Sequence, residues 1–182
     1  MGTSFTSYGL RRAVQAWFDD RAGAESLYGP IGAWSTSKTT DFFKLFYEKE
    51  TFDEDLSGWD SAQVTTMAHM FYSATTFNND ISGFDTSQVM SMREMFYRAK
   101  AFNRDLSSFD TGRVVTMRAM FGEASSFNGD VTSFDVGRVA SMYIMFYYAT
   151  SFNQCLGWDL ASGVDTRGMF DNSRGGISQN CA

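Results

Sequence analysis

A motif that returns every 25 residues constrains this chain more than any other feature. A Met-Phe pair recurs with this period at positions 70, 95, 120 and 145, then one residue early at Met169-Phe170. Phenylalanine recurs with the same spacing at Phe52, Phe77, Phe102, Phe127 and Phe152. One such unit cannot bury its own apolar side, so a regular period predicts that successive units stack on one another.

The period divides the chain of 182 residues into one repeat domain with two atypical ends. We predict an N-terminal helical cap at 1–26 and a C-terminal cap tail at 176–182. Between them we expect a solenoid with six copies, at 27–51, 52–76, 77–101, 102–126, 127–151 and 152–175. The first copy is degenerate and the last is shortened, as terminal repeats often are.

Within each copy, the local pattern predicts one short strand and one short helix. Val64, Met67, Met70, Phe71 and Ala74 have the spacing of one helix face. The stretch at 55–60 is short and bounded by turn residues, which favours a strand. We therefore predict an α/β fold, a right-handed solenoid with about six leucine-rich-repeat-like coils and an N-terminal capping helix.

Stacking places equivalent residues in columns, and most methionines fall in two such columns. Nine of the eleven methionines share these positions, which are 67, 70, 92, 95, 117, 120, 142, 145 and 169. A methionine stripe can bind a soft metal or form a promiscuous binding surface. We interpret these residues instead as core, where flexible side chains fill gaps beside phenylalanine.

Polar columns predict structural roles at the bends of each coil. Asparagine at 78, 103, 128 and 153 is expected to satisfy backbone groups where regular bonding stops. Aspartate forms two columns, at 55, 80, 105 and 130 and at 60, 85, 110, 135 and 159. We expect these carboxylates to accept backbone N–H bonds in turns. Calcium between coils is the alternative for the first column.

The N-terminal stretch 7–20 has the pattern of an amphipathic helix. Ser7 is a candidate cap, and Leu10, Val14, Trp17 and Phe18 fall on one face. Such a helix would cover the exposed side of the first coil. The residues after it are expected to lead to Pro30 and the first strand.

Composition and motifs exclude several functional classes. A net charge of −6 and a sequence pI near 4.7 argue against nucleic acid as the main partner. No apolar run reaches the ~18 residues of a membrane span. His69 is the only histidine, and there is no phosphate loop, dinucleotide fingerprint or zinc pattern. We therefore predict a protein that is not an enzyme and needs no cofactor or metal.

Deviations from the repeat indicate a candidate binding surface. The position after Met-Phe holds tyrosine in most copies and glycine at 122. Copies three and four add several basic residues. Tyrosine and arginine are enriched where proteins anchor their partners. The predicted binding residues are Tyr72, Tyr97, Tyr147, Arg93, Arg98 and Arg118. A mixed solvated surface, with tyrosine sealing the core edge, is the alternative.

The two cysteines, Cys155 and Cys181, lie in and just after the last copy. A disulfide between them would hold the C-terminal cap in place and would imply an oxidising compartment. Two free thiols in a reducing compartment are the alternative, followed by a metal site with another ligand.

The combined repeat resembles the BspA-type leucine-rich-repeat surface-protein family, whose motif is similar to "FNxDLSxWDxSxVxxMxxMFxxAxx". The resemblance covers about 27–181, and "LRRAVQAWFDD" and the Cys-terminated tail look like the ends of the algal members. This chain departs from the motif with Phe for Trp in the middle copies and with Cys155 in "FNQCLGWD". The resemblance implies a solenoid binding or adhesion module without catalytic residues.

We therefore expect a non-catalytic module that presents a rigid surface to a protein or a glycan. The alternative is a structural accessory subunit, permanently docked in a larger assembly that could be associated with a membrane. An enzyme ranks third, by analogy with the aspartates on parallel β-helix polysaccharide enzymes. The expected location is extracytoplasmic: secreted, on the cell surface or in an organelle lumen.

Overall fold

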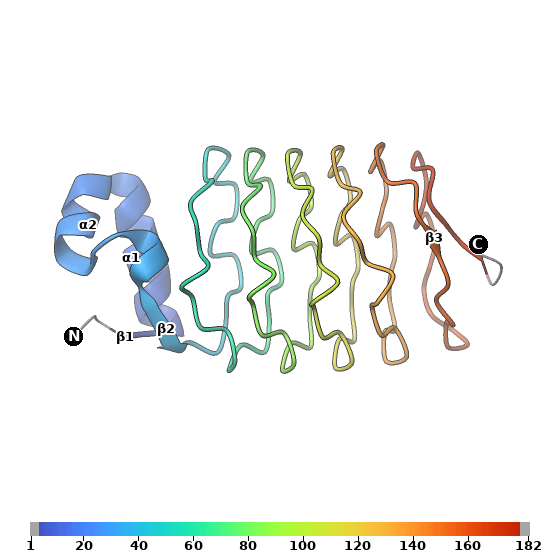
Figure 1. Ribbon diagram of the computed structural model, residues 1–182, viewed down its shortest axis with the longest axis horizontal. Helices are drawn as coiled ribbons and strands as arrows, with labels where there is room; N and C mark the ends of the chain where they lie inside the picture. The colour runs from blue at the N-terminus through green and yellow to red at the C-terminus, as the bar shows by residue number, and fades with distance from the viewer. Residues whose placement is uncertain (1–3, 179–182) are drawn as a thin grey trace.

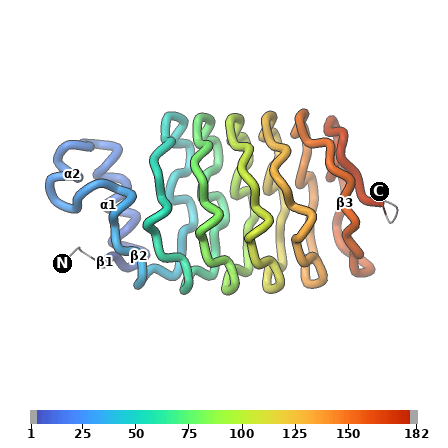
Figure 2. Tube along the Cα trace, in the orientation of Figure 1, coloured from blue at the N-terminus to red at the C-terminus, as the bar shows by residue number. Residues whose placement is uncertain are grey.

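Hydrogen bonds between residues about 25 positions apart organise most of this chain. The computed structural model describes residues 4–178 and shows successive coils stacked side by side along the long axis (Figures 1 and 2). The two helices lie together at one end of the stack, and the C-terminal coil lies at the other. The vertical registry predicted from the repeat is therefore confirmed.

Regular secondary structure is confined to the two ends of the stack. The N-terminal end contains β1 (Ser4–Thr6), α1 (Ser7–Asp19), α2 (Arg21–Tyr28), the 3-10 turn η1 (Ile31–Ala33) and β2 (Ser35–Lys38). The C-terminal end contains β3 (Cys155–Leu156) and β4 (Gly176–Ile177). Strands β1 and β2 pair in parallel, as do β3 and β4. The chain between β2 and β3 is irregular, with isolated parallel bridges that join one coil to the next.

The predicted helix in each copy is wrong. In the second copy, the segment from Met67 to Ala74 forms consecutive turns, and His69 and Ser73 have left-handed φ angles of 58° and 53°. The N–H groups of Met67 and His69 donate to the carbonyls of Ser91 and Arg93 in the next coil, at 3.0 and 2.9 Å. An α-helix needs these donors for its own i→i−4 bonds. Bonding between coils therefore replaces the helix that the apolar spacing predicted.

The predicted strand at 55–60 is also wrong in this position. There the Asp55 carboxylate accepts the N–H of Ser57 at 2.8 Å, which makes a turn. The parallel bridges lie further along each copy, in a column from Thr66 through Ser91 to Thr116. Among the described residues, strands occur near the predicted position only in the two terminal copies. These are β2, which follows Pro30 in the first copy, and β3 in the last copy. The fold is thus mostly irregular rather than regular α/β.

A large aromatic core holds the coils together. In the first five coils, the Phe of the Leu-Phe or Met-Phe pair stacks on the Phe six residues later, which begins the next copy. The ring centroids are 3.9 Å apart in the Phe71–Phe77 and Phe96–Phe102 pairs. Rings of successive coils, such as Phe71 and Phe96, are 5.6 Å apart and nearly parallel. The methionines predicted as core are all buried, at no more than 3% exposure. The interpretation of these columns as core is confirmed.

The polar columns have the structural roles predicted for them. The side-chain oxygen of Asn78 accepts the backbone N–H of Asn103 at 2.9 Å, and Asn103 does the same for Asn128. Both aspartate columns form turns: Asp80 accepts the N–H of Ser82, and Asp85 that of Ser87. Among residues 4–178, no group of three or more His, Cys, Asp or Glu side chains is arranged to hold a metal ion.

The N-terminal cap covers the first coil as predicted, with two differences in detail. Leu10, Val14 and Trp17 of α1 are buried, and Phe18 packs against the core. The helix cap is Thr6, whose hydroxyl accepts the N–H of Gly9 at 3.3 Å, and not Ser7. Helix α2 was not predicted, and the predicted cap boundary at residue 26 falls inside it. Within 4–178, neither helix has the length and apolar character needed to cross a bilayer.

Candidate functional site

Three tyrosines form a stacked column on one face of the coils. The ring centroids of Tyr47 and Tyr72 lie 4.7 Å apart, and those of Tyr72 and Tyr97 lie 5.1 Å apart, with the rings within 18° of parallel. All three side chains are half-buried. The column exists because the position after Met-Phe points to the edge of the core, where a ring can pack on its neighbour and still reach water.

An acidic side chain binds the end of this column. Glu123 accepts hydrogen bonds from the Tyr97 hydroxyl and from the Arg98 guanidinium, the latter at 2.9 and 3.2 Å. Burial and the bond to Glu123 raise the pKa of Tyr97. The bond from Arg98 is the main reason that the pKa of Glu123 is lowered. The carboxylate is therefore charged and already neutralised by Arg98 at physiological pH.

Gly122 interrupts the tyrosine column. A Cβ atom at this position would lie 2.8 Å from two ring carbons of Tyr97, which is too close. The missing side chain therefore gives the Tyr97 ring the space that it occupies on the way to Glu123. Tyrosine returns in the next coil as Tyr147, which contacts Tyr148 edge-on with ring centroids 4.5 Å apart.

A hollow of about 400 Å³ lies beside this interruption. Its walls are aromatic, charged and hydroxyl-bearing, and they come from three successive coils: Lys100, Glu123, Ser125, Tyr147, Tyr148 and Thr150. Tyr148 is 45% exposed, which is unusual for so large an apolar ring. The hollow can hold a ligand of a few ring atoms against the tyrosines, with polar groups in the same lining.

The predicted binding residues divide into two groups. Tyr72, Tyr97 and Arg98 lie together, and Arg98 is within 5.3 Å of the Tyr97 ring centre. Tyr147 lies on the same face beyond the interruption and lines the hollow.

Arg93 and Arg118 belong to a different column. Arg93 pairs with Glu94 at 3.0 Å, and the Arg118 guanidinium lies 4.7 Å from the centre of the Tyr143 ring. Among the described residues, no side-chain hydrogen bond or cation–π contact joins these two arginines to the tyrosine column. The single cluster that the sequence predicted is therefore two surfaces.

Tyr148 and Glu123 were missing from the predicted site, whereas Lys100 is one of the basic residues that distinguish copies three and four. The sequence could have indicated Tyr148, because its position in the repeat is polar in every earlier copy. Those earlier residues are Glu48, Ser73, Arg98 and Glu123. An aromatic residue that appears once in a polar column is a deviation of the same kind as Gly122.

His69 lies against aromatic rings, with Phe43 at 5.5 Å and Tyr72 at 6.0 Å. Burial is the main cause of its lowered pKa, so the imidazole is neutral at pH 7. Its Nδ1 lies 3.4 Å from Glu94 but does not have the geometry of a hydrogen bond.

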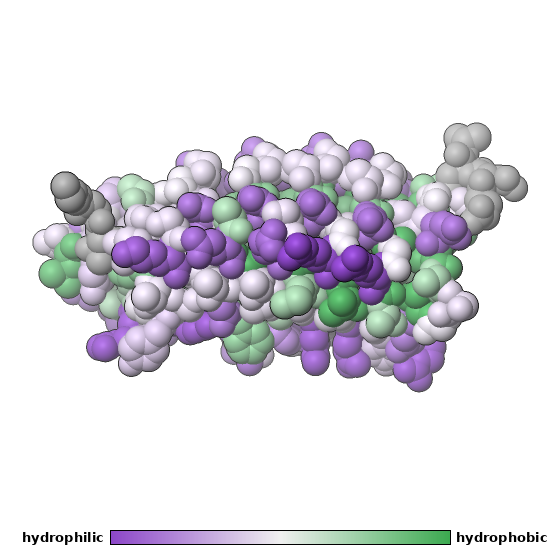
Figure 3. Space-filling view, turned by 90° about the horizontal axis from the view of Figure 1, so that it is seen from below, coloured by the Kyte–Doolittle hydropathy of each residue, from purple (hydrophilic) through white to green (hydrophobic). Residues whose placement is uncertain are grey.

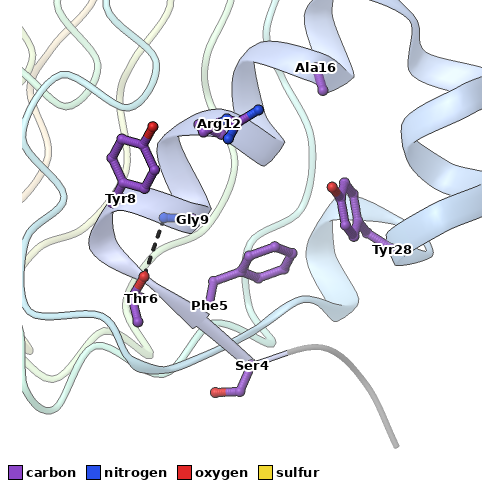
Figure 4. A pocket seen from close by; sticks show the side chains of 8 residues that line it. All are labelled: Ser4, Phe5, Thr6, Tyr8, Gly9, Arg12, Ala16 and Tyr28. Atoms are coloured by element: carbon purple, nitrogen blue, oxygen red, sulfur yellow. Dashed lines mark hydrogen bonds between the residues drawn. The ribbon is translucent and has the colours of Figure 1, made fainter.

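Other hollows have fewer features of a binding site. A hollow of about 460 Å³ lies in the N-terminal cap, where Phe5, Tyr8, Arg12 and Tyr28 line it (Figure 4). A further hollow of about 350 Å³ lies between Met90, Val115 and neighbouring arginines. Seen from below, the surface is mostly polar, with hydrophobic side chains in small groups (Figure 3).

Comparison with known proteins gives one family match. The model described as "Mycoplasma protein of unknown function, DUF285" matches residues 13–112 and, in a second overlapping copy, 79–180. Two overlapping matches agree with a repeated sequence. The search of curated proteins and the search of solved structures each gave no match.

Proposed function

Because the chain belongs to the DUF285 family, which contains repeats, we propose that it is a non-catalytic module that binds a protein or a glycan. The stacked column of Tyr47, Tyr72 and Tyr97 is the observation that carries this proposal. Its rings are fixed by their neighbours in the stack, so little side-chain entropy is lost when a partner covers them.

The charges next to the column support the same proposal. Arg98 is exposed while its guanidinium is oriented by Glu123, so a partner meets a cation in a fixed position. A rigid aromatic surface with an oriented arginine is typical of the residues that anchor a partner.

The finer fold assignment is also part of this proposal. We interpret the stack as a right-handed solenoid of the leucine-rich-repeat type and the chain as a relative of the BspA-type surface proteins. An extracytoplasmic location would follow from that relationship and from a Cys155–Cys181 disulfide. Cys181 lies outside the described residues, so this disulfide stays a prediction.

A structural accessory subunit is the second candidate function. It is favoured by an exposed apolar pair, since Met90 is 51% and Val115 is 48% exposed. Arg113 and Arg138 line the same shallow hollow. A permanent neighbour would cover these side chains, and the protein would then purify with that neighbour at fixed stoichiometry.

The test compares the protein with a variant that lacks the tyrosine surface. Tyr72→Ala, Tyr97→Ala and Arg98→Ala are combined, and both proteins are immobilised and exposed to extract and to glycans of the native source. Binding that is lost in the triple variant supports the proposal. The matched control is Tyr8→Ala, which removes a 71% exposed tyrosine from the cap and should retain binding.

Equal binding by the protein and a folded triple variant would contradict the proposal. Circular dichroism and thermal unfolding establish that the variants are folded. Loss of binding only in a Met90→Ser, Val115→Ser variant would instead favour the accessory subunit.

A further inference from the structure

We propose that the hollow beside Gly122 is a saccharide subsite that takes an acidic sugar, one whose ring carries a carboxylate. This inference rests on the proposed function and names the ligand class of its surface. It concerns the group defined by Lys100, Glu123, Ser125, Tyr147, Tyr148 and Thr150, which we call the acidic-sugar subsite.

The two tyrosines provide the surface for the apolar face of a sugar ring. Tyr148 is 45% exposed, and its edge-on contact with Tyr147, at 67° between the ring planes, fixes its orientation. A tyrosine has an apolar ring face and a polar, solvent-exposed hydroxyl, so it suits ligands that combine C–H surface with polar groups. The pair therefore forms a platform and a side wall for one ring.

The backbone holds Tyr148 in this exposed position at a cost. Its φ angle is 52°, in the left-handed region that large residues rarely adopt. The equivalent position in the other coils holds a polar residue, and in the last coil it is Asn172. The same left-handed conformation occurs at this position in every coil, so the feature that sets Tyr148 apart is its exposed aromatic ring and not its backbone.

The polar wall of the hollow can bind hydroxyl and carboxylate groups. Ser125 and Thr150 add hydroxyls, and the Thr150 hydroxyl lies 3.3 Å from the Ser125 carbonyl. The Lys100 ammonium forms no ion pair within 4.0 Å among the described residues, so it is available to a ligand.

The local charge favours an anion over a cation. Glu123 is paired with Arg98 at 2.9 Å, so its charge is compensated within the protein. Among the residues that line the subsite, Lys100 is then the cation without an ion pair, and the Asp171 carboxylate of the last coil also acts on the Tyr147 hydroxyl. A cationic ligand held by the two rings would be repelled by the Lys100 ammonium, which disfavours an aromatic cage for quaternary amines beside it.

The size and openness of the subsite agree with one ring of a longer chain. A volume of about 400 Å³ is near the lower end of ligand sites, which run from roughly 300 to 1,000 Å³. The hollow opens onto the same face as the tyrosine column, so further sugars could continue along that face.

Calorimetric titration of the full chain provides the test. The probes are tetramers of glucuronate, galacturonate and mannuronate, each compared with its carboxyl-reduced, neutral counterpart. We expect at least one acidic tetramer to bind with a dissociation constant of about 1 mM or tighter. Tyr148→Ala should weaken that binding by about tenfold or more, and Lys100→Gln should abolish the preference for the acidic over the neutral form.

Tyr8→Ala, far from the subsite, is the matched control and should bind like the unmodified protein. No binding by any of the three tetramers at about ten times that concentration would overturn the inference. Binding that is unchanged in a folded Tyr148→Ala variant would overturn it as well.

The failure of this inference can be told apart from the failure of the proposed function. One outcome is that the tetramers fail to bind while the triple alanine variant at Tyr72, Tyr97 and Arg98 loses binding of a partner. In that case only the assignment of the acidic-sugar subsite is contradicted. If neither the tetramers nor any partner depends on these residues, the proposed function is wrong too.

Discussion

Single residues in left-handed turns bear much of the conformational cost of this fold. Two such residues, four positions apart, recur in every coil, as at His69 and Ser73. The left-handed conformation costs a non-glycine residue about 1–2 kcal/mol. The cost is tolerated because, in the first five coils, each of these residues donates its N–H to the next coil, at 2.9 and 2.7 Å for this pair.

Ile144 is the residue where relief of this strain is easiest to measure. Its φ is 49°, a genuine outlier for a β-branched residue, and the equivalent residue of the last coil is Gly168. We expect Ile144→Gly to stabilise the protein by about 1 kcal/mol in urea unfolding. Val115→Gly, at an exposed position without a positive φ, should destabilise it by about 1 kcal/mol. Equal destabilisation by both changes would contradict the strain argument.

The turn aspartates predict a loss of stability in acid. Hydrogen bonds from the backbone of the residue two positions later are the main cause of the lowered pKa values of Asp55, Asp80 and Asp130. A carboxyl with a lowered folded-state pKa stabilises the fold above its unfolded pKa and loses that contribution as the pH falls through the folded value.

We therefore expect a free energy of unfolding that is flat near neutral pH and decreases below about pH 4. A triple Asp→Asn variant at these positions keeps the turn acceptors and should show a shallower decrease. The measurement is urea unfolding between pH 7 and pH 2.5. An identical acid slope in the variant would show that these turns are not its source.

At the scale of the repeated element, a buried hydroxyl column ties each coil to the next. The hydroxyls of Thr86 and Thr111 donate to the backbone carbonyls of Asp110 and Asp135, both at 2.9 Å. Both threonines are no more than 2% exposed, so each hydroxyl has this carbonyl as its partner in place of water. The column ends at Val136, which shows that valine fits this position sterically.

Thr86→Val should therefore remove one buried hydrogen bond without a change in shape. We expect a loss of about 1–2 kcal/mol in the free energy of unfolding, since the carbonyl of Asp110 loses its partner. Thr86→Ser is the matched control, because it keeps the hydroxyl, as Ser61 does in the previous coil. Thermal or urea unfolding measures both. If Val is tolerated better than Ser at this position, the hydroxyl column does not stabilise the stack.

The sequence predicted the columns of this element but not its backbone. The period alone placed Met70, Met95 and Met120 above one another, because stacking is the only way to bury a repeated apolar side. The spacing of Val64, Met67 and Met70 also fits a helix, and local bonding would have made one. Hydrogen bonds to the next coil use the N–H groups that a helix would need. The sequence pattern of one copy does not predict these bonds, because their acceptors lie in another copy.

The same limit applies to the candidate site. Tyr72 and Tyr97 could be predicted as neighbours because they share a column. Arg93 could not be separated from Arg98, because the direction of each side chain depends on the left-handed conformation of Glu94 and of Arg98 itself. The hollow at Tyr148 depends on three coils at once and on Gly122, so it appears only when the coils are in place.

The whole molecule has a polarity that results from these bonds. In each of five successive coil pairs, four backbone N–H groups of one coil donate to carbonyls of the next, as from Phe71 to Met95 and from Phe96 to Met120. One or two N–H groups in each pair donate in the opposite direction, as from Thr65 to Thr40, so the peptide dipoles align along the stack only in part. In this part of each coil, the first coil presents carbonyls at one end, and the last coil presents amides at the other.

The two ends of the stack differ in how they are covered. At the carbonyl end, Arg11 of α1 donates to the backbone carbonyl of Phe43 and pairs with Asp41, which places a cation at the negative pole. At the other end, four N–H groups of the last coil have no bond within residues 4–178: those of Thr166, Gly168, Phe170 and Asn172. An ordinary β-strand would present both donors and acceptors to this edge and would fit it poorly.

The carbonyls of the first coil in a second copy of the chain would complement these amides. In the intact protein, the N-terminal cap covers those carbonyls. Deletion of residues 1–33 should therefore allow copies to stack head to tail, because a heterologous contact of this kind does not close. Light scattering and electron microscopy should show filaments with parallel coils. Phe170 ends the phenylalanine column, with its ring centroid 5.5 Å from that of Phe146. Phe170→Lys in the deleted chain places a charge there and should keep the deleted chain monomeric. A folded, monomeric deletion variant would show that the cap does not prevent stacking.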